Sequence, residues 1–400
     1  MKRKIAVAAA LAATLLGAAA CGSKGDNTPT TSASGPVDGK GKTIKVWLMV
    51  DAQTAWKGVV DDAGKRFTDA TGAQVSVEYQ QWPNHLTKLD ATLAGSDVPD
   101  VVELGNTEFS KYVFNAGARV LIYRKDLFTA AGVTAAPKTY DEFLADADKL
   151  QTAKKSDPKF GAIYLPGKYW YSAMSFVKST GGDIAKQDGG KWAGQLEQPA
   201  SVQGLQRWVD LVKKYSKAGP AKDESDQAGI FAQGEAGMFY GNAWEQGAAE
   251  QVKKDPNDPN SALVDTKVKG KLAAAPMPDI PSFLGGSNLG VTQKSANKEL
   301  AAQWIKYFTG STSMAGLIKA SALLNSTALL DQAATQNPAI APAALAAKSS
   351  WFTPNADKWA DVEKANILQT MLTDILTGKK TAADGAKWAD DQINTTLNAS

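Results

Sequence analysis

Strand and helix patterns alternate along the first part of the folded chain, and this alternation restricts the fold more than any other feature of the sequence. Residues 43–50 (TIKVWLMV) are mostly apolar, as is typical of a strand buried on both faces. Apolar residues at helical spacing follow in 56–67, and strand and helix patterns return at 74–79 and 86–93. A third strand pattern lies at 100–104. This order predicts a parallel α/β sheet.

Polar residues follow each of these three predicted strands. Ligands of parallel sheets bind beyond the carboxyl ends of the strands. The loops 51–54, 81–85 and 105–108 are therefore the expected binding region. About 360 residues follow residue 42, which is more than one hydrophobic core usually serves, so the length predicts two lobes.

The remaining sequence carries further local signals. Thr139 and Glu142 have the spacing of a capping box and predict the start of a helix. Apolar residues at helical spacing mark 201–215 as an amphipathic helix. The glycine pairs that begin at 181, 189 and 285 are not followed by the lysine and serine of a phosphate loop, so we interpret them as turns. Residues 160–166 indicate a strand and its exit, and 234–246 indicate a short buried strand that ends in a loop and the start of a helix.

The amino terminus has the features of an export signal. Three basic residues (2–4) precede a short apolar run, and small residues precede Cys21, which is the one cysteine of the 400-residue chain. Cys21 stands where bacterial lipoprotein signals place the lipidated residue, although Ala18 replaces the usual leucine of that motif. The alternative is a secreted protein with an incidental thiol. We predict lipidation of Cys21, and several acyl chains, because one chain binds a membrane reversibly.

Composition restricts the partners of the mature chain. Loss of residues 2–4 with the signal leaves 41 of the 44 basic residues against 41 acidic ones, which argues against a nucleic acid as the partner. Residues 22–42 are polar and rich in glycine, serine and threonine, as in a flexible tether. No later segment is apolar over the length that a membrane-spanning helix needs.

The chain lacks the residues that most catalytic and metal sites require. With one histidine, His85, and one cysteine, no zinc site and no cofactor are expected. Paired carboxylates leave glycoside hydrolysis open, because Asp51, Asp97, Glu103 and Glu108 all lie near the expected rim of the first sheet. Carboxylates there can equally accept hydrogen bonds from sugar hydroxyls without any reaction.

The tryptophans indicate a sugar as the ligand. Trp56, Trp208, Trp304 and Trp388 fall on apolar helical faces, where core packing is expected. Four others stand in loops or helix breaks beside aromatic and amide residues, where their flat faces suit the apolar faces of sugar rings. These four are Trp82, Trp170, Trp244 and Trp351, for each of which core packing remains an alternative.

Several segments together resemble a known family. The segments 45–49, 89–108, 120–150, 234–244 and 285–308 are similar, in this order, to the extracellular solute-binding lipoproteins of carbohydrate ABC transporters. Residues 77–93 (VEYQQWPNHLTKLDATL) are similar to the actinobacterial group that takes up disaccharides, including chitobiose binders. The resemblance implies a two-lobed, periplasmic-binding-protein-like (type II) α/β fold that closes over a neutral oligosaccharide and delivers it to the permease subunits. It implies a monomeric binding protein on the outer face of the cytoplasmic membrane rather than an enzyme.

The resemblance also implies domain boundaries and site residues. The signal peptide would be 1–20 and the lipidated tether 21–42; lobe 1 would comprise 43–116 and 270–312, and lobe 2 would comprise 117–269 and 313–400. The implied ligand-binding residues are Asp51, Gln53, Gln81, Trp82, Asp97, Asn106, Thr107, Tyr169, Trp170, Trp244, Gly285, Gly286, Ser287 and Trp351. A lipid-anchored glycoside hydrolase and an adhesion lipoprotein are the alternatives from other functional classes; the sequence has no repeats to favour adhesion.

One segment departs from the family. Relatives have an extra stretch between the helix that corresponds to 109–118 and the strand that corresponds to 119–128, whereas this chain passes straight from one to the other. A few dozen residues, with a first hinge crossing, are expected to be missing. The shortened chain would either lose normal closure and binding or keep a shorter, working crossing.

Overall fold

The structure is a computed structural model, and it describes residues 37–105, 107–108, 113–255, 261–324 and 330–399. The strands are β1 Thr43–Met49, β2 Gln74–Gln80, β3 Val101–Gly105, β4 Val113–Arg124, β5 Gly161–Tyr164, β6 Ala185–Asp188, β7 Lys191–Gly194, β8 Ala236–Asn242, β9 Gln251–Lys253, β10 Leu263–Asp265, β11 Leu272–Ala275, β12 Ser282–Val291, β13 Leu323–Leu324 and β14 Ser350–Trp351. The helices are α1 Val50–Thr54, α2 Lys57–Thr71, α3 His85–Ala94, α4 Lys125–Ala130, α5 Tyr140–Ala153, α6 Trp170–Ser179, α7 Pro199–Tyr215, α8 Gln227–Ala232, α9 Trp244–Glu250, α10 Lys298–Thr309, α11 Ser311–Lys319, α12 Leu330–Gln336, α13 Ala341–Ala347, α14 Trp359–Lys364, α15 Ile367–Leu376 and α16 Ala382–Leu397.

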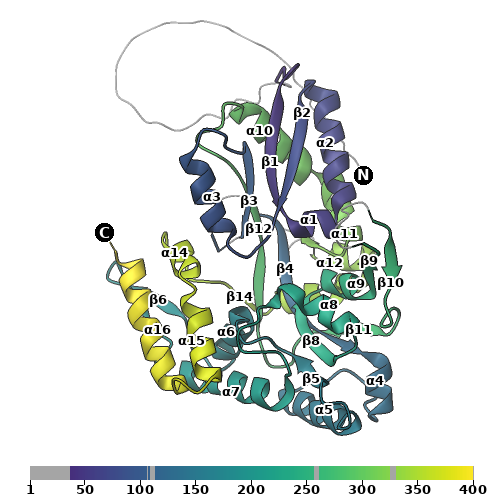
Figure 1. Cartoon of the computed structure of the whole chain (residues 1–400), viewed down its shortest axis with the longest axis vertical. Coiled ribbons are helices and arrows are strands. Elements are labelled where there is room, and N and C mark those ends of the chain that lie inside the picture. Colours follow the sequence, from purple (N-terminus) through teal and green to yellow (C-terminus); the bar gives the residue numbers. More distant parts are fainter. Residues whose placement is uncertain (1–36, 106, 109–112, 256–260, 325–329, 400) are drawn as a thin grey trace, which may run out of the picture. The chain divides into compact units, whose positions relative to one another are not determined.

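One mixed sheet connects most of these strands in the order β2-β1-β3-β12-β4-β8-β5, as Figure 1 shows. Strands β2, β1 and β3 run parallel, with Val46 opposite Val77 on one side and Val101 on the other. This confirms the parallel α/β arrangement predicted for the first part of the chain. Strand β12 is antiparallel to both β3 and β4, β4 is antiparallel to β8, and β5 is parallel to β8.

Separate hydrophobic cores form on the two halves of this sheet. Around β1 and β3, the buried side chains of Phe67 on α2 and Trp304 and Phe308 on α10 pack together, and the last two rings stack at 5.1 Å. We call the part around this core the first lobe. Around β5 and β8, a larger core joins α5, α6, α7, α15 and α16, and a smaller one joins β4 and β8 to α8, α12 and α13. We call the part around these two cores the second lobe; its predicted boundaries along the chain stay predictions.

The crossing from β3 to β4 is short because β4 continues in the direction of β3. Gly105, the last residue of β3, lies opposite Ser287 of β12, and Val113, the first residue of β4, lies opposite Asn288. A parallel strand that starts again beside its predecessor needs a return crossover of a dozen or more residues. Here β4 starts where β3 stops, on the other side of β12, so the chain needs no return, and residues 106–112 make the connection.

Two predictions about this region were wrong. The helix expected over 109–118 is not formed in its described part, because residues from Val113 onward pair with β12 as strand β4. The pair Gly285 and Gly286 is not a turn but lies within the ten-residue strand β12, where Gly286 has a φ of +148° that disfavours any side chain. By contrast, Gly181 and the pair at 189–190 have positive φ in turns, as predicted.

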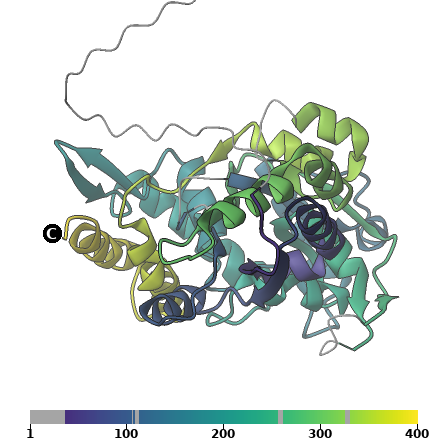
Figure 2. The same ribbon diagram turned by 90° about the horizontal axis from the view of Figure 1, so that it is seen from above.

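Local helix signals were more reliable. The Oγ of Thr139 accepts a hydrogen bond from the backbone N–H of Glu142 at 3.2 Å, so the predicted helix start is confirmed at α5. The predicted amphipathic helix is α7, which buries Trp208 and packs on α6. Figure 2 shows the yellow carboxyl-terminal helices beside the teal hairpin of β6 and β7, against which α16 packs. Among the described helices, none has both the length and the apolar character to cross a bilayer.

Candidate functional site

The loops after β1, β2 and β3 converge, as expected for a parallel sheet. The indole Nε1 of Trp82 donates a hydrogen bond to the carboxylate of Asp51 at 2.8 Å, and burial raises the pKa of Asp51. The backbone oxygen of Trp82 bonds to one ring nitrogen of His85, and the other ring nitrogen lies 2.9 Å from Glu108. Burial alone would lower the pKa of His85, but the Glu108 carboxylate outweighs it and the pKa is raised. A continuous series of hydrogen bonds therefore links the three loops, from Asp51 through Trp82 and His85 to Glu108.

Glu103 is a buried carboxyl group in the middle of β3. One of its oxygens accepts a hydrogen bond from the backbone N–H of Met49 at 2.8 Å, and its side chain also bonds to Ser287 on β12. Burial raises the pKa of Glu103 to about 7, more than these two hydrogen bonds lower it. Burial thus makes the protonated form of Glu103 more favourable than it is in water.

Arg119 lies on β4, where the strand passes into the second lobe, and its side chain is surrounded by aromatic rings. Its exposed fraction is 7%. The guanidinium carbon lies 4.4 Å from the ring centre of Tyr171 and 5.0 Å from that of Phe283, and these two rings stack at 4.5 Å. Its Nε donates a hydrogen bond to the hydroxyl of Tyr169 at 2.8 Å. A charge in such a position is stabilised by the ring faces.

The start of α9 reaches from the second lobe to the first. Trp244 packs edge-on against Trp56, with ring centres 6.3 Å apart and planes at 90°. The next residue, Glu245, is buried; its carboxylate accepts from the backbone N–H of Asn242 at 2.7 Å and from the amide of Gln227 at 2.6 Å. Burial raises its pKa to about 7, and the charges of Arg119 and Asp51 both act on it.

A second contact between the lobes comes from α14. Glu363 accepts a hydrogen bond from the indole Nε1 of Trp359 at 2.6 Å and bonds to the hydroxyl of Thr107 in the rim after β3. Burial, and then the nearby Glu108 carboxylate, raise the pKa of Glu363 to about 8. Lys364 forms an ion pair with Asp90 on α3. We call Asp51, Trp82, Glu103, Arg119, Trp244, Glu245 and Glu363 the interlobe cluster.

The structure brings together some of the residues predicted from the sequence. Asp51 with Trp82, Thr107 with Glu363, and Ser287 with Glu103 are in contact, and Trp244 reaches the first lobe. Gly285 is beside Arg119, because a Cβ on it would stand 3.3 Å from Nη1, and Gly286 follows it in β12. Gln53 is partly buried on α1, and Gln81 is exposed after β2.

Other predicted residues lie elsewhere. Asp97 is exposed and pairs with Lys45 in β1, before β3 begins, so the structure does not bring it to the interlobe cluster. Tyr169, Trp170 and Trp351 are buried in the second-lobe core. Asn106 and Cys21 lie outside the described residues.

Sequence reasoning missed three members of the interlobe cluster, namely Arg119, Glu245 and Glu363. The signal for Arg119 was a charged residue inside the apolar run AGARVLIY. No comparable signal marks Glu363 on its short helix.

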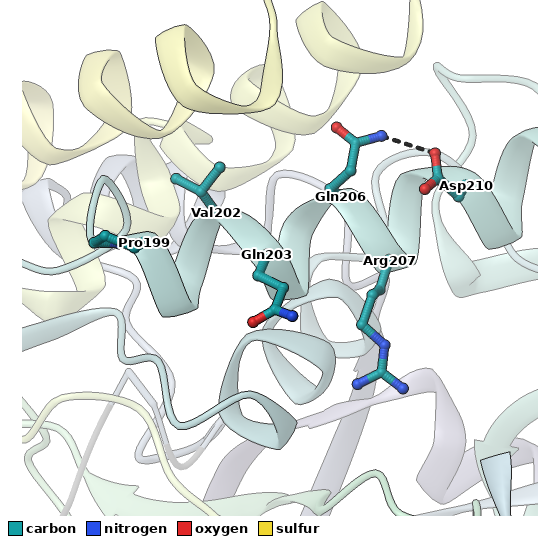
Figure 3. A pocket seen from close by; sticks show the side chains of 6 residues that line it. All are labelled: Pro199, Val202, Gln203, Gln206, Arg207 and Asp210. Carbon is teal, nitrogen blue, oxygen red and sulfur yellow. Dashed lines mark hydrogen bonds between the residues drawn. The ribbon is translucent and has the colours of Figure 1, made fainter.

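Two surface hollows are separate from this cluster. One, of about 530 Å³, is lined by α7 alone, and there Gln206 donates to Asp210 at 2.7 Å, as Figure 3 shows. The other, of about 420 Å³, lies between the β6–β7 hairpin, residues 355–358 and the end of α16. In the described part of the chain, no three His, Cys, Asp or Glu side chains are placed to hold a metal ion.

Comparison with known proteins identifies the family. A family model described as bacterial extracellular solute-binding protein matches residues 47–315. The chain belongs to this family. A curated relative, the diacetylchitobiose binding protein DasA of Streptomyces coelicolor, is 30% identical over 440 positions that cover 99% of each chain. Those 440 positions exceed the 400 residues of this chain by 40, so the relative has stretches without a counterpart here.

Solved structures of solute-binding proteins share the two-lobed fold. The maltose-bound MalE3 of T. maritima has a TM-score of 0.72 at 21% identity and covers 89% of this chain and 100% of its own. The GacH receptor of Streptomyces glaucescens, solved unliganded and with acarbose, has a TM-score of 0.71 at 18% identity and covers 90% of this chain and 99% of its own. The predicted fold is confirmed, and so is the prediction of a solute-binding protein rather than an enzyme.

Proposed function

We propose that this solute-binding protein captures a neutral oligosaccharide, a disaccharide of the chitobiose type, outside the cell and delivers it to the permease subunits of an ABC transporter. The observation that carries the proposal is the likeness of the whole chain to a diacetylchitobiose binding protein. The interlobe cluster supports it, because indole rings and carboxylates that project from both lobes are the groups that hold sugar rings and hydroxyls.

The proposed anchor follows from the amino-terminal sequence, and the proposed absence of a nucleic-acid partner follows from the balanced net charge of the mature chain. Lipidation of Cys21 after removal of 1–20 would tether the monomeric body to the outer face of the cytoplasmic membrane through 21–42. The two lobes would comprise 43–116 with 270–312 and 117–269 with 313–400. The proposed ligand contacts are Asp51, Trp82, Thr107, Trp244, Gly285, Gly286 and Ser287, with the buried Tyr169, Trp170 and Trp351 as support from the second-lobe core. No metal, cofactor or nucleic acid takes part.

Ligand binding is tested with residues 21–400 carrying Cys21→Ser. Isothermal titration and thermal melts with diacetylchitobiose, cellobiose, maltose and xylobiose should show micromolar binding of one sugar, about −8 kcal/mol, and an upward shift in Tm. Trp244→Ala should weaken that binding by about 2 kcal/mol if the ring stacks on the sugar. Trp192→Ala, which changes a tryptophan of the distant β6–β7 hairpin, is the matched control. A cooperative melt that no sugar shifts would refute the proposed ligand class.

The anchor has its own test. Full-length protein expressed in its host should fractionate with membranes and carry acyl chains on Cys21 by mass spectrometry, whereas Cys21→Ser should be released into the medium. Membrane retention of the serine variant would contradict lipidation at this residue.

A further inference from the structure

Helix α14 of the second lobe brings a carboxyl group against the first lobe. Glu363 on this helix bonds to the hydroxyl of Thr107 in the loop after β3. The next residue, Lys364, forms an ion pair with Asp90 on α3, and Figure 1 shows the two helices on the same side of the sheet. We call the meeting of Glu363 and Lys364 with Thr107, Glu108 and Asp90 the α14 contact.

A second carboxylate acts on Glu363 from the first lobe. Oε2 of Glu108 accepts a hydrogen bond from the backbone N–H of Gly105 at 2.8 Å and lies 2.9 Å from Nε2 of His85. Of the charges that act on Glu363, that of Glu108 is the strongest, and the charge of His85 acts in the opposite sense. Among the described residues, no lysine or arginine pairs with either carboxylate. Two like charges therefore meet where the lobes touch, with one histidine beside them.

The other titratable groups around α14 are neutral or engaged elsewhere. Tyr171 on α6 stays neutral, because burial raises its pKa well above the ordinary value. Helices α15 and α16 also pack against α14. The charged groups on these three helices and just before α14 have partners of their own or are exposed: Lys358 with the backbone oxygen of Ala399, Asp361 in solvent, Asp374 with Lys379 and Lys380, Asp384 with Thr381, Lys387 with Asp391, and Asp390 with the backbone of 196–197.

The protonation of Glu363 depends on whether the lobes touch. In the α14 contact, burial and the Glu108 carboxylate raise the pKa of Glu363 to about 8. If α14 moved away from the loop after β3, both influences would be lost. The hydrogen bond from Trp359 would remain, because Trp359 and Glu363 are on the same helix. The pKa would then return towards its ordinary value of 4.5, so contact and proton binding favour each other.

We propose that the α14 contact is a proton-dependent closure device: Glu363 takes up a proton from solvent as the lobes close and returns it as they open, so that closure weakens as pH rises. This inference rests on the proposed opening and closing around a sugar. The O–H bond of the carboxyl group is the only covalent bond that forms or breaks. A neutral Glu363 can donate to the Thr107 hydroxyl, whereas an ionised Glu363 is repelled by the Glu108 carboxylate. Sugar binding is therefore tightest in a mildly acidic medium.

The first measurement needs no sugar. Residues 21–400 carrying Cys21→Ser receive spin labels at the exposed positions Ala94→Cys on α3 and Gln392→Cys on α16, and the distance between the labels is measured at pH 6 and pH 8. The ratio of the short-distance to the long-distance population should fall about 10-fold between these pH values, because the closed form binds more protons than the open form. Circular dichroism at both pH values verifies that the chain stays folded.

Glu363→Gln is neutral at every pH and should change this ratio by less than about threefold between pH 6 and pH 8. Asp361→Asn is the matched control, because it removes an exposed carboxylate from the same helix. It should follow the wild type. An equal pH response of wild type and E363Q would assign the effect to other carboxyl groups and overturn the inference.

The second measurement counts protons during sugar binding. Isothermal titration with diacetylchitobiose at pH 7, in phosphate and in Tris buffer, should show that the wild type takes up about 0.5–1 proton more than E363Q. Label distances that do not change with pH, together with equal proton uptake by the two proteins, would overturn the inference. If no sugar binds, the label distances alone decide the inference, and the proposed function fails separately.

Discussion

The buried carboxyl group of Glu245 makes the stability of the folded chain depend on pH. Burial raises its pKa from 4.5 to about 7, and the hydrogen bonds from Asn242 and Gln227 offset only part of that rise. The unfolded chain keeps the ordinary value, so between pH 4.5 and 7 the folded state binds more protons and stability falls as pH rises. The difference corresponds to about 3 kcal/mol of unfolding free energy, which is present at pH 4.5 and below and lost by about pH 8.

Glu245→Gln removes this titration and keeps the shape of the side chain. The Oε1 of Gln227 has no hydrogen-bond partner in the described structure, so a rotated Gln227 amide can accept from the new amide nitrogen. In urea denaturation of residues 21–400 carrying Cys21→Ser, the wild type should lose about 2.5 kcal/mol more than the variant between pH 5 and pH 8. The exposed Glu299 on α10 gives the control, Glu299→Gln, which should follow the wild-type profile. Identical pH profiles for wild type and E245Q would refute the reasoning.

Three further substitutions test the packing, each by its denaturation midpoint against wild type. Gly204→Ala should destabilise the second lobe by about 1–3 kcal/mol, because its Cβ would come within 2.5 Å of the α6 backbone; an unchanged midpoint would mean that the helices separate freely. Thr139→Ala should cost about 1 kcal/mol through the lost cap of α5, and Thr139→Ser should restore it. Asp390→Ala should cost about 2–5 kcal/mol, because it leaves the backbone N–H groups of Leu196 and Glu197 without their acceptor; Asp390→Asn should retain part of that stability.

The first lobe could be predicted from the sequence because its elements are specified locally. Buried parallel strands have continuous apolar runs, as in β1, and helices repeat apolar residues every three or four positions, as in α2. Strand β4 was missed at its start because residues 113–118 (VFNAGA) show no periodicity. Their strand conformation depends on pairing with β12, a partner about 170 residues later in the chain. The pair Gly285 and Gly286 was likewise ambiguous. Two adjacent glycines can form a turn, or they can lie in a strand that passes close to another side chain, which here is Arg119.

The candidate site was predictable only where topology alone places the residues. The rule that ligands bind beyond strand ends brought Asp51 and Trp82 together, and they share a hydrogen bond. The same rule does not say which end of a helix lies near the carboxyl ends of the strands. Asp97 was therefore predicted as a site residue, although it lies before β3 and pairs with Lys45. Glu363 contacts Thr107 across more than 250 residues of sequence, and only the assembled fold shows that its carboxyl group is buried.

The contacts described between the two lobes are individually weak, as closure over the proposed sugar would require. The edge contact of Trp56 with Trp244 contributes about 1 kcal/mol beyond its buried area. The hydrogen bond of Thr107 to Glu363 contributes about 1 kcal/mol, and the exposed ion pair of Lys364 with Asp90 between 0 and about 1 kcal/mol. In the proposed opening and closing, these three contacts would add only a few kcal/mol to the closed form, so a ligand that touches both lobes would shift the population by its difference in affinity for the two forms. A sugar that bonds to Asp51 in the first lobe and packs on Trp244 of the second would supply that difference.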